Sequence, residues 1–285
     1  MRVLLTNDDG ISSAGLCALV RAFCHSHQVL VAAPATNKSG VSSQINPKSF
    51  LCVKKASIEG AKEAFAVEGS PVDCVLFGMS HFDSIDVVVS GINNGANLGT
   101  DVIYSGTCGA ARQAAFLGVP GIALSVDFDL AEPSGYISCS EESVYFDKLA
   151  HFALKNLEQL IALCAKPVLC KRVLSPTQEA DGEKYYEFFV NVNAPAAEKY
   201  KGARLTYPCV RRYFQDTERE QKGDDAVFSN KGKLVVLSLA RAQECASDFE
   251  ACKSGFVAVS QIYSEPSFPP LDEGVAKEAL LDVSF

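Results

Sequence analysis

Three short apolar runs in the first 90 residues are not interrupted by polar side chains, and they lie within residues 2–6, 28–33 and 86–90. A strand with one solvated face alternates apolar and polar residues, whereas a strand buried on both faces is apolar throughout. A helical pattern separates the first two runs, because Leu16, Leu19 and Phe23 share one helical face. The chain therefore predicts a doubly wound, Rossmann-like α/β fold, with a mostly parallel sheet and helices on both faces.

The other elements follow from the same patterns. Ser70, Pro71 and Asp73 indicate the start of a helix over 70–80, with a serine cap, a first-turn proline and a capping-box carboxylate. Further helices are predicted at 107–117, 140–164 and 272–281, and further strands at 50–56, 64–67, 121–125, 171–175, 188–193 and 255–263. A polar segment at about 203–245 is predicted to be a projecting hairpin. We expect one domain over 1–285, in which 1–130 carries the site and 131–285 completes the core.

Composition argues against several classes of protein. The formal net charge is −8, from 26 basic and 34 acidic residues, which disfavours a protein that coats nucleic acid or binds anionic membranes. No apolar stretch approaches the ~20 residues that span a bilayer. The N-terminus lacks the pattern of a signal peptide, so we expect a cytoplasmic protein. The eleven cysteines include no C-x-x-C pair, and we interpret them as structural free thiols.

The tetrapeptide Asn-Asp-Asp-Gly at residues 7–10 directly follows the first predicted strand. Two carboxylates about 4 Å apart repel by ~1 kcal/mol in water and by ~4 kcal/mol at an effective dielectric of about 20. A bound cation usually offsets such repulsion, so the tetrapeptide indicates a cation site. The alternative interpretation is an Asp-Gly turn whose carboxylates are solvated. Polar, glycine-containing loops also follow the next two apolar strands, at 37–40 and 90–99. Because ligands bind at the carboxyl ends of strands in such sheets, these loops predict one shared site.

The side chains of these loops are oxygen donors, which favours a hard cation. Two carboxylates with a hydroxyl and an amide oxygen suit Mg²⁺, Mn²⁺ or Ca²⁺, and they do not suit zinc or copper. Such an ion offsets both carboxylates, so a phosphate dianion can approach without net repulsion. Ser105 and Thr107 stand at the start of a predicted helix, where hydroxyls and backbone N–H groups bind phosphate; a plain helix cap is the alternative. The histidines are poorly placed for catalysis, so proton transfer falls to a carboxylate.

Four motifs occur in order over residues 1–125: T-N-D-D-G, K-S-G, E-G-S-P-V-D-C-V and S-G-I-N-N-G-A-N-L-G-T-D-V-I-Y-S-G-T. Together they resemble the SurE family, the survival-protein 5'/3'-nucleotidases. The resemblance implies metal-dependent hydrolysis of nucleoside 5'- and 3'-monophosphates, with one divalent ion (Mg²⁺ or Mn²⁺) per subunit. It also implies a homodimer or homotetramer that exchanges a C-terminal extension.

The resemblance also implies roles for individual residues. The implied metal ligands are Asp8, Asp9, Ser39 and Asn93. Asp8 and Asp9 are also the implied catalytic residues, and which of them accepts the proton is left open. The implied substrate-binding residues are Asn7, Lys38, Asn97, Ser105, Gly106 and Thr107. Lys38 stands where the family often has arginine, a departure that bears on substrate preference.

Two other interpretations are weighed against this one. A haloacid-dehalogenase-like phosphatase forms an aspartyl-phosphate, but it needs two aspartates separated by one residue, and Asp8 and Asp9 are adjacent. A non-catalytic nucleotide-sensing protein is the alternative from another functional class, because it could use the same fold. Nucleotide binding without turnover, in the presence of metal, would identify such a sensor. The sequence leaves the preferred base and the choice between 5' and 3' phosphates open.

Overall fold

The computed structural model describes residues 1–129, 139–165, 167–170, 183–222, 225–237 and 245–265. Within these ranges, a nine-stranded sheet forms the centre of the molecule. Its strands, from one edge to the other, are β10 (Ala203–Thr206), β13 (Val257–Tyr263), β9 (Phe188–Pro195), β6 (Gly121–Asp127), β5 (Val87–Asn94), β1 (Arg2–Thr6), β2 (Gln28–Pro34), β4 (Glu63–Val67) and β3 (Val53–Ala56). The pairs β9–β13 and β3–β4 are antiparallel, and the other neighbouring pairs in this sheet are parallel.

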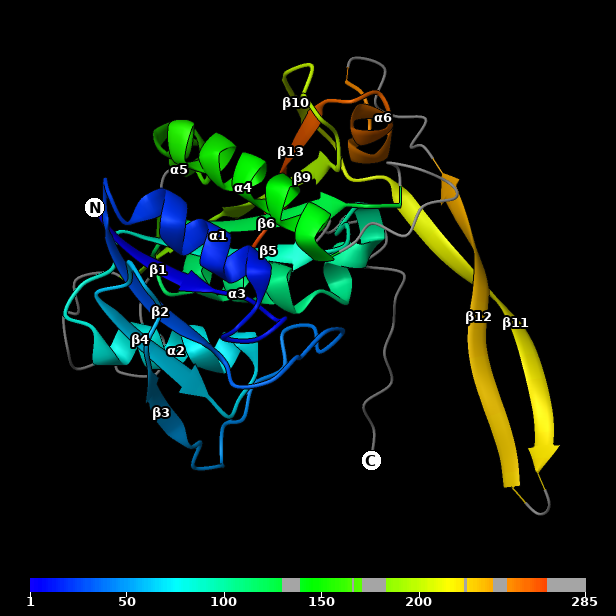
Figure 1. Ribbon diagram of the computed structural model, residues 1–285, viewed down its shortest axis with the longest axis horizontal. Helices are drawn as coiled ribbons and strands as arrows, with labels where there is room; N and C mark the ends of the chain where they lie inside the picture. Colours follow the sequence, from blue (N-terminus) through cyan, green and yellow to red (C-terminus); the bar gives the residue numbers. More distant parts are fainter. Residues whose placement is uncertain (130–138, 166, 171–182, 223–224, 238–244, 266–285) are drawn as a thin grey trace, which may run out of the picture.

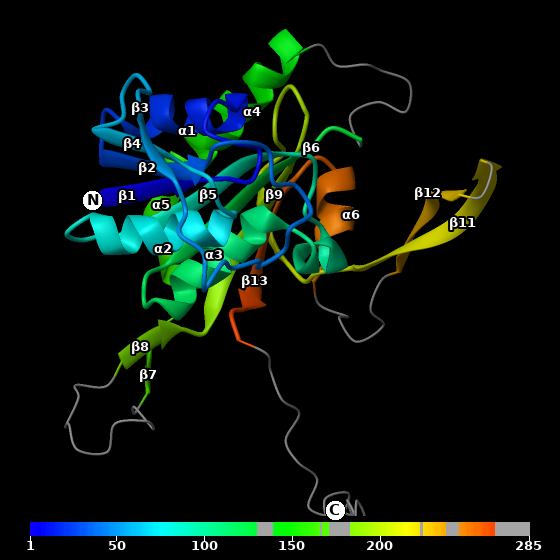
Figure 2. The same ribbon diagram turned by 90° about the horizontal axis from the view of Figure 1, so that it is seen from below.

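Helices cover both faces of this sheet (Figures 1 and 2). One face carries α1 (Ala14–Phe23), α4 (Cys139–Lys155) and α5 (Leu157–Leu163), and the other carries α2 (Pro71–His81) and α3 (Gly106–Phe116). A 3-10 helix, η1 (Gly99–Ile103), precedes α3, and a short helix, α6 (Asp248–Lys253), packs on β13. The predicted doubly wound α/β fold is therefore confirmed. Within the described ranges, no helix has the length and apolar character needed to cross a bilayer.

The apolar runs are buried on both faces, which explains why they do not alternate with polar residues. In β1, Val3 and Leu5 pack in the hydrophobic cluster on the side of α1, α4 and α5. Leu4, between them, packs in the cluster on the side of α2 and α3. All three side chains are completely buried, and each contributes about 1.5–3 kcal/mol by leaving water. A core of this kind fixes the strand, and therefore fixes the polar residues that follow its carboxyl end.

The predicted start of α2 is confirmed. The Ser70 hydroxyl accepts the N–H of Asp73 at 3.1 Å, and the Asp73 carboxylate accepts the N–H of Ser70 at 2.8 Å. The start of α3 is capped by Ser105, whose hydroxyl accepts the N–H of Cys108 at 3.1 Å. These side chains satisfy backbone donors that a helix leaves unpaired, so both helices begin at defined residues.

Two sequence-based boundaries are wrong for local reasons. The single helix predicted over 140–164 is two helices that are separated at Asn156, whose backbone departs from helical angles (φ −110°, ψ 18°). The loop predicted from residue 90 begins only after Asn94. The strand β5 continues through a bulge and pairs Asn93 with Ser125 of β6.

The projecting hairpin begins later than predicted, and residues 238–244 of the predicted segment lie outside the described residues. Residues 203–206 form β10, which pairs with β13 at the edge of the main sheet instead of joining the hairpin. The hairpin consists of β11 (Val210–Lys222) and β12 (Asp225–Leu237), and it extends away from the body (Figures 1 and 2). A second two-stranded pair is formed by β7 (Pro167–Cys170) and β8 (Glu183–Tyr186). The predicted strand 171–175 and helix 272–281 lie outside the described residues.

Candidate functional site

The carboxyl ends of β1, β2 and β5 meet at one edge of the sheet. Asp8 follows β1, and its carbonyl oxygen accepts the N–H of Lys38, from the loop after β2, at 2.6 Å. One carboxylate oxygen of Asp9 accepts the N–H of Asn94, at the end of β5, at 3.3 Å. These hydrogen bonds join the three polar loops at this edge of the sheet.

Asp8 also contacts the first turn of α3. Its Oδ1 accepts the Thr107 hydroxyl at 2.6 Å, and its Oδ2 accepts the Thr107 N–H at 3.1 Å. A Cβ added to Gly106 would lie 2.9 Å from the Asp8 Cβ and 3.1 Å from Cγ of Pro71. Glycine is therefore required for α3 to begin this close to the carboxylate. The N-terminus of a helix carries partial positive charge, which favours the ionised form of Asp8.

Both aspartates are costly to ionise in this position. Burial raises the pKa of Asp8, and hydrogen bonds from Thr107 offset only part of the effect. Burial, with the nearby charge of Asp8, raises the pKa of Asp9 to about 6. None of the salt bridges among the described residues includes either carboxylate. One buried and one partly exposed carboxylate, neither in a salt bridge with a described residue, fit a site that binds a cation.

Neutral oxygens must complete such a site. Among the residues that the structure describes, no three His, Cys, Asp or Glu side chains form a possible metal cluster. Ser39 lies in the loop after β2 and is exposed, and its N–H donates to Oδ1 of Asn37 at 2.9 Å. The side-chain amide of Asn93 donates to the Gly95 carbonyl at 2.8 Å, which fixes the amide and leaves its Oδ1 as an acceptor. Ser39 and Asn93 therefore remain suitable oxygen donors.

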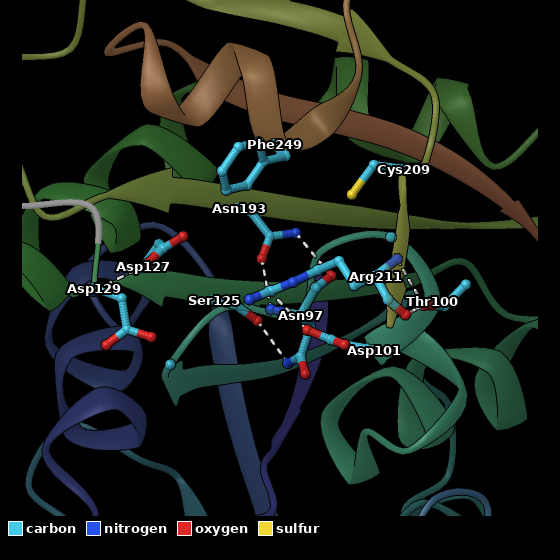
Figure 3. Close-up of polar contacts among 12 residues, drawn as sticks. Asn97, Thr100, Asp101, Ser125, Asp127, Asp129, Asn193, Cys209, Arg211 and Phe249 are labelled. Carbon is cyan, nitrogen blue, oxygen red and sulfur yellow. Dashed lines mark hydrogen bonds and ion pairs between the residues drawn. The ribbon is translucent and has the colours of Figure 1, made fainter. Parts of the chain in front are cut away.

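Asn97 is held by the strands beside it (Figure 3). Its N–H donates to Oδ1 of Asn193 at 2.8 Å, and its side-chain amide donates to the Ser125 hydroxyl at 2.8 Å. Its carbonyl oxygen accepts the side-chain N–H groups of Asn191 at 2.8 Å and Asn193 at 3.2 Å. These four hydrogen bonds fix the loop after β5, and they leave Oδ1 and one N–H of the Asn97 amide for a ligand.

Asn7 differs from the other predicted site residues. Its side chain is buried, donates to the Gly10 carbonyl at 2.9 Å and to the Ser13 hydroxyl at 2.6 Å, and accepts the Gly10 N–H at 3.2 Å. These contacts hold the turn at 7–10 and connect it to the N-cap of α1. Substrate binding by Asn7 stays a prediction.

Known proteins are similar to this chain in sequence and in fold. The family model described as "Survival protein SurE" matches residues 3–215. The chain belongs to the SurE family. The 5'-nucleotidase SurE of Dehalococcoides mccartyi (strain CBDB1) is 31% identical over 286 residues, which cover 97% of this chain and 95% of that protein. The 5'-nucleotidase SurE of Syntrophomonas wolfei is 32% identical over 269 residues, with 92% and 89% covered. The crystal structure of the SurE protein from Aquifex aeolicus has the same fold, with a TM-score of 0.68 at 24% identity and 98% of each chain covered.

In this SurE chain, several residues that hold the site are absent from the predicted set. Asn191 and Asn193 alternate with apolar residues in the buried strand β9. A buried amide needs a hydrogen-bond partner, so this alternation is the sequence signal that indicates a polar contact at β9. Asp248 is 1% exposed and accepts the N–H groups of Gly99 at 2.6 Å and Cys209 at 2.9 Å. Its partners are distant in the sequence, and no local pattern indicates them.

Proposed function

We propose that this chain is a phosphomonoesterase that hydrolyses nucleoside 5'- and 3'-monophosphates to nucleoside and phosphate with a divalent metal ion. The observation that carries the proposal is the position of Asp8 and Asp9, which lie together at the carboxyl edge of the sheet, beside the start of α3. The relatives named above carry the name 5'-nucleotidase SurE, which supports the same class of substrate.

The donor set suits a hard divalent ion. The ligands that we assign to one Mg²⁺ or Mn²⁺ per subunit are Asp8, Asp9, Ser39 and Asn93. All four donors are oxygens, and the two carboxylates carry the two negative charges that such an ion offsets. When bound, the ion supplies positive charge that polarises a phosphoryl oxygen and lowers the pKa of water.

The two aspartates differ in their freedom, which supports different roles. Both oxygens of Asp8 accept hydrogen bonds from Thr107, so Asp8 is held in one orientation. Asp9 is partly exposed and accepts a long hydrogen bond from the Asn94 N–H. We assign Asp9 to orient the attacking water and accept its proton, and Asp8 to a fixed ligand position.

The phosphate is assigned to the loop after β5 and the start of α3. The Ser105 hydroxyl accepts the Cys108 N–H, which leaves its proton to donate to a phosphate oxygen. The Thr107 hydroxyl already donates to Asp8, so its part is to orient that carboxylate. Asn97 supplies an amide N–H, and Gly106 allows α3 to begin close to Asp8. Lys38, whose N–H donates to the Asp8 carbonyl, is the cationic side chain that we assign to the phosphate. Together these groups would hold the phosphate in line with the water.

Phosphate release from a panel of 5'- and 3'-nucleoside monophosphates, measured with Mn²⁺ and with EDTA, tests the proposed function. We expect release from nucleoside monophosphates with Mn²⁺ and none with EDTA. A simple aryl phosphate serves as the control for an unspecific phosphatase. Saturable nucleotide binding without phosphate release in Mn²⁺ would contradict the proposal and indicate a nucleotide sensor instead.

We also propose that the protein is a homodimer or homotetramer that uses the β11–β12 hairpin in its interface. The hairpin extends away from the body, and an isolated two-stranded hairpin is at best marginally stable in water (Figure 1). A partner subunit would supply the surface that the hairpin needs.

Shortening the hairpin should lower the oligomeric mass. Replacement of residues 216–231 by an Asn-Gly turn keeps the base of the hairpin, where β11 contacts the body, and removes its outer part. The mass measured by light scattering should fall to that of a smaller assembly, and the circular dichroism spectrum should show that the body still folds. An unchanged mass would mean that the subunits associate through another surface.

A further inference from the structure

The base of the hairpin is attached to η1, the short helix between Asn97 and the start of α3 (Figure 3). The Thr100 hydroxyl donates to the Arg211 carbonyl at 2.6 Å and accepts the Arg211 N–H at 3.0 Å. One side chain in η1 is therefore bonded to both backbone groups of one residue in β11. This attachment orders the backbone of β11 where it passes the site.

A buried ion pair lies beside this attachment. The Arg211 guanidinium is 2.7 Å from the Asp101 carboxylate, and the two side chains are only 9% and 12% exposed. The Tyr213 hydroxyl lies 3.0 Å from each oxygen of the same carboxylate. Exposed ion pairs contribute little, but removing one partner of a buried pair leaves an uncompensated charge. Asp101 is therefore held by two residues of β11.

Asp101 in turn orders the chain that leads into α3. Its carbonyl oxygen accepts the N–H of Tyr104 at 2.9 Å and the N–H of Ser105 at 3.2 Å. Ser105 is the N-cap of α3, and Thr107 in the first turn holds Asp8. Displacement of Asp101 would consequently move the cap and the residues that orient the carboxylate.

We propose that Arg211 is a positioning residue of this site, which acts through Asp101 to hold η1 and so places Ser105 at the start of α3. The inference rests on the proposed phosphatase function and adds to the site a residue from the hairpin strand. Nothing in the local sequence indicates it, because Arg211 belongs to a polar segment more than a hundred positions after Asp101.

A direct role for Arg211 is the competing explanation. The Arg211 Nε is buried and has no hydrogen-bond partner in the described part of the chain, so a phosphate oxygen could be its acceptor. The two roles differ in what Asp101 contributes. If Arg211 acts through Asp101, removing either residue has the same consequence, and the effects of the two substitutions are not additive.

The experiment compares Arg211→Met, Asp101→Asn and the double variant, with Arg212→Met as the matched control. Arg212 is the next residue of the same strand, and it is exposed. Hydrogen exchange of the segment 99–107 reports on η1 and the start of α3 without any need for turnover. Exchange of the segment 71–81, in α2, reports general destabilisation.

Arg211→Met should speed exchange in 99–107 and leave 71–81 unchanged, and Arg212→Met should change neither. With a nucleoside monophosphate and Mn²⁺, Arg211→Met should lower kcat by about 100-fold, because small displacements of positioning groups have effects of this size. The double variant should be no slower than the slower single variant. Arg211→Lys, which retains the charge, should recover part of the loss.

Several results would overturn this role. Unchanged exchange in 99–107 would show that Arg211 does not hold η1, whatever the activity. An increase in KM and in the inhibition constant of inorganic phosphate at unchanged kcat, additive with Asp101→Asn, would show that Arg211 binds phosphate directly. Absence of phosphate release by the wild type would contradict the proposed function, and the exchange measurement would still decide whether Arg211 holds the segment.

Discussion

EDTA should reduce phosphate release to background, Mn²⁺ or Mg²⁺ should restore it, and Asp9→Asn should remain inactive when the metal is restored. The substitution keeps the side-chain volume, but it removes one of the two carboxylates proposed to bind the cation. It also removes the proposed proton acceptor. We expect kcat/KM at saturating Mn²⁺ to fall by at least about 1000-fold, or about 4 kcal/mol, since each 1.36 kcal/mol is tenfold.

Thermal unfolding of Asp9→Asn shows whether its loss of activity comes from a loss of folding stability. The pKa of Asp9 is raised from 3.8 to about 6, so the folded, metal-free protein holds its proton more tightly than the unfolded chain does. Stability is therefore lost as the pH rises through this interval, and above it the ionised Asp9 destabilises the fold. Asp9→Asn removes that charge. In EDTA, at a pH above this interval, the Tm of the variant should be no lower than that of the wild type. Mn²⁺ should raise the Tm of the variant less than it raises the Tm of the wild type.

Asp86→Asn is the matched control for Asp9→Asn. Asp86 lies just before β5, at the opposite end of the sheet, where its carboxylate accepts the Arg2 N–H at 2.7 Å. This variant should keep wild-type turnover and the full increase in Tm with Mn²⁺. Full turnover by the wild type in metal-free buffer would contradict a metal-dependent mechanism.

The parts of the site that could be predicted depend on local signals. The apolar run at 3–5 identifies a strand buried on both faces, and Asp8 and Asp9 directly follow it. Ser70 and Asp73 define the start of α2 by a capping box that the structure contains. In a parallel sheet the carboxyl ends of strands share one edge, so three loops could be placed together before any contact was known.

The parts that could not be predicted depend on distant partners. No local pattern pairs Asp101 with Arg211, and only the packing of β11 on η1 buries the two side chains together. The residues of β10 directly precede the hairpin and are mostly exposed, so the sequence does not separate them from it, and pairing with β13 decides their place. Asn156 separates α4 from α5 within an otherwise continuous helical pattern, and the sequence pattern does not indicate the break.

A second large effect is expected from Asn93→Asp, which adds a third carboxylate to the site at nearly constant volume. The Asn93 amide donates to the Gly95 carbonyl, so its Oδ1 is the atom available to a cation. An aspartate loses that hydrogen bond and turns one oxygen away from the carbonyl. The variant should still bind Mn²⁺, because a hard cation prefers a more negative oxygen.

Substrate, in contrast, should bind poorly to this variant. Three carboxylates and one divalent ion leave a net negative charge, and a phosphate dianion near it meets repulsion of roughly 1–4 kcal/mol. Since each 1.4 kcal/mol is tenfold, kcat/KM should fall by roughly ten- to a thousandfold. A metal titration and a kcat/KM measurement on one nucleoside monophosphate, at saturating Mn²⁺, give the two quantities separately.

Asn94→Asp is the control for a charge that is close to the site but outside the ligand set. Asn94 is exposed, and its side-chain amide lies 3.4 Å from the Glu142 carboxylate. A carboxylate at this position is screened by solvent, so it should lower kcat/KM far less than Asn93→Asp does. If Asn93→Asp binds Mn²⁺ and turns over like the wild type, charge balance does not explain the amide at position 93. If both variants lose activity equally, the effect comes from the general negative potential and not from a ligand position.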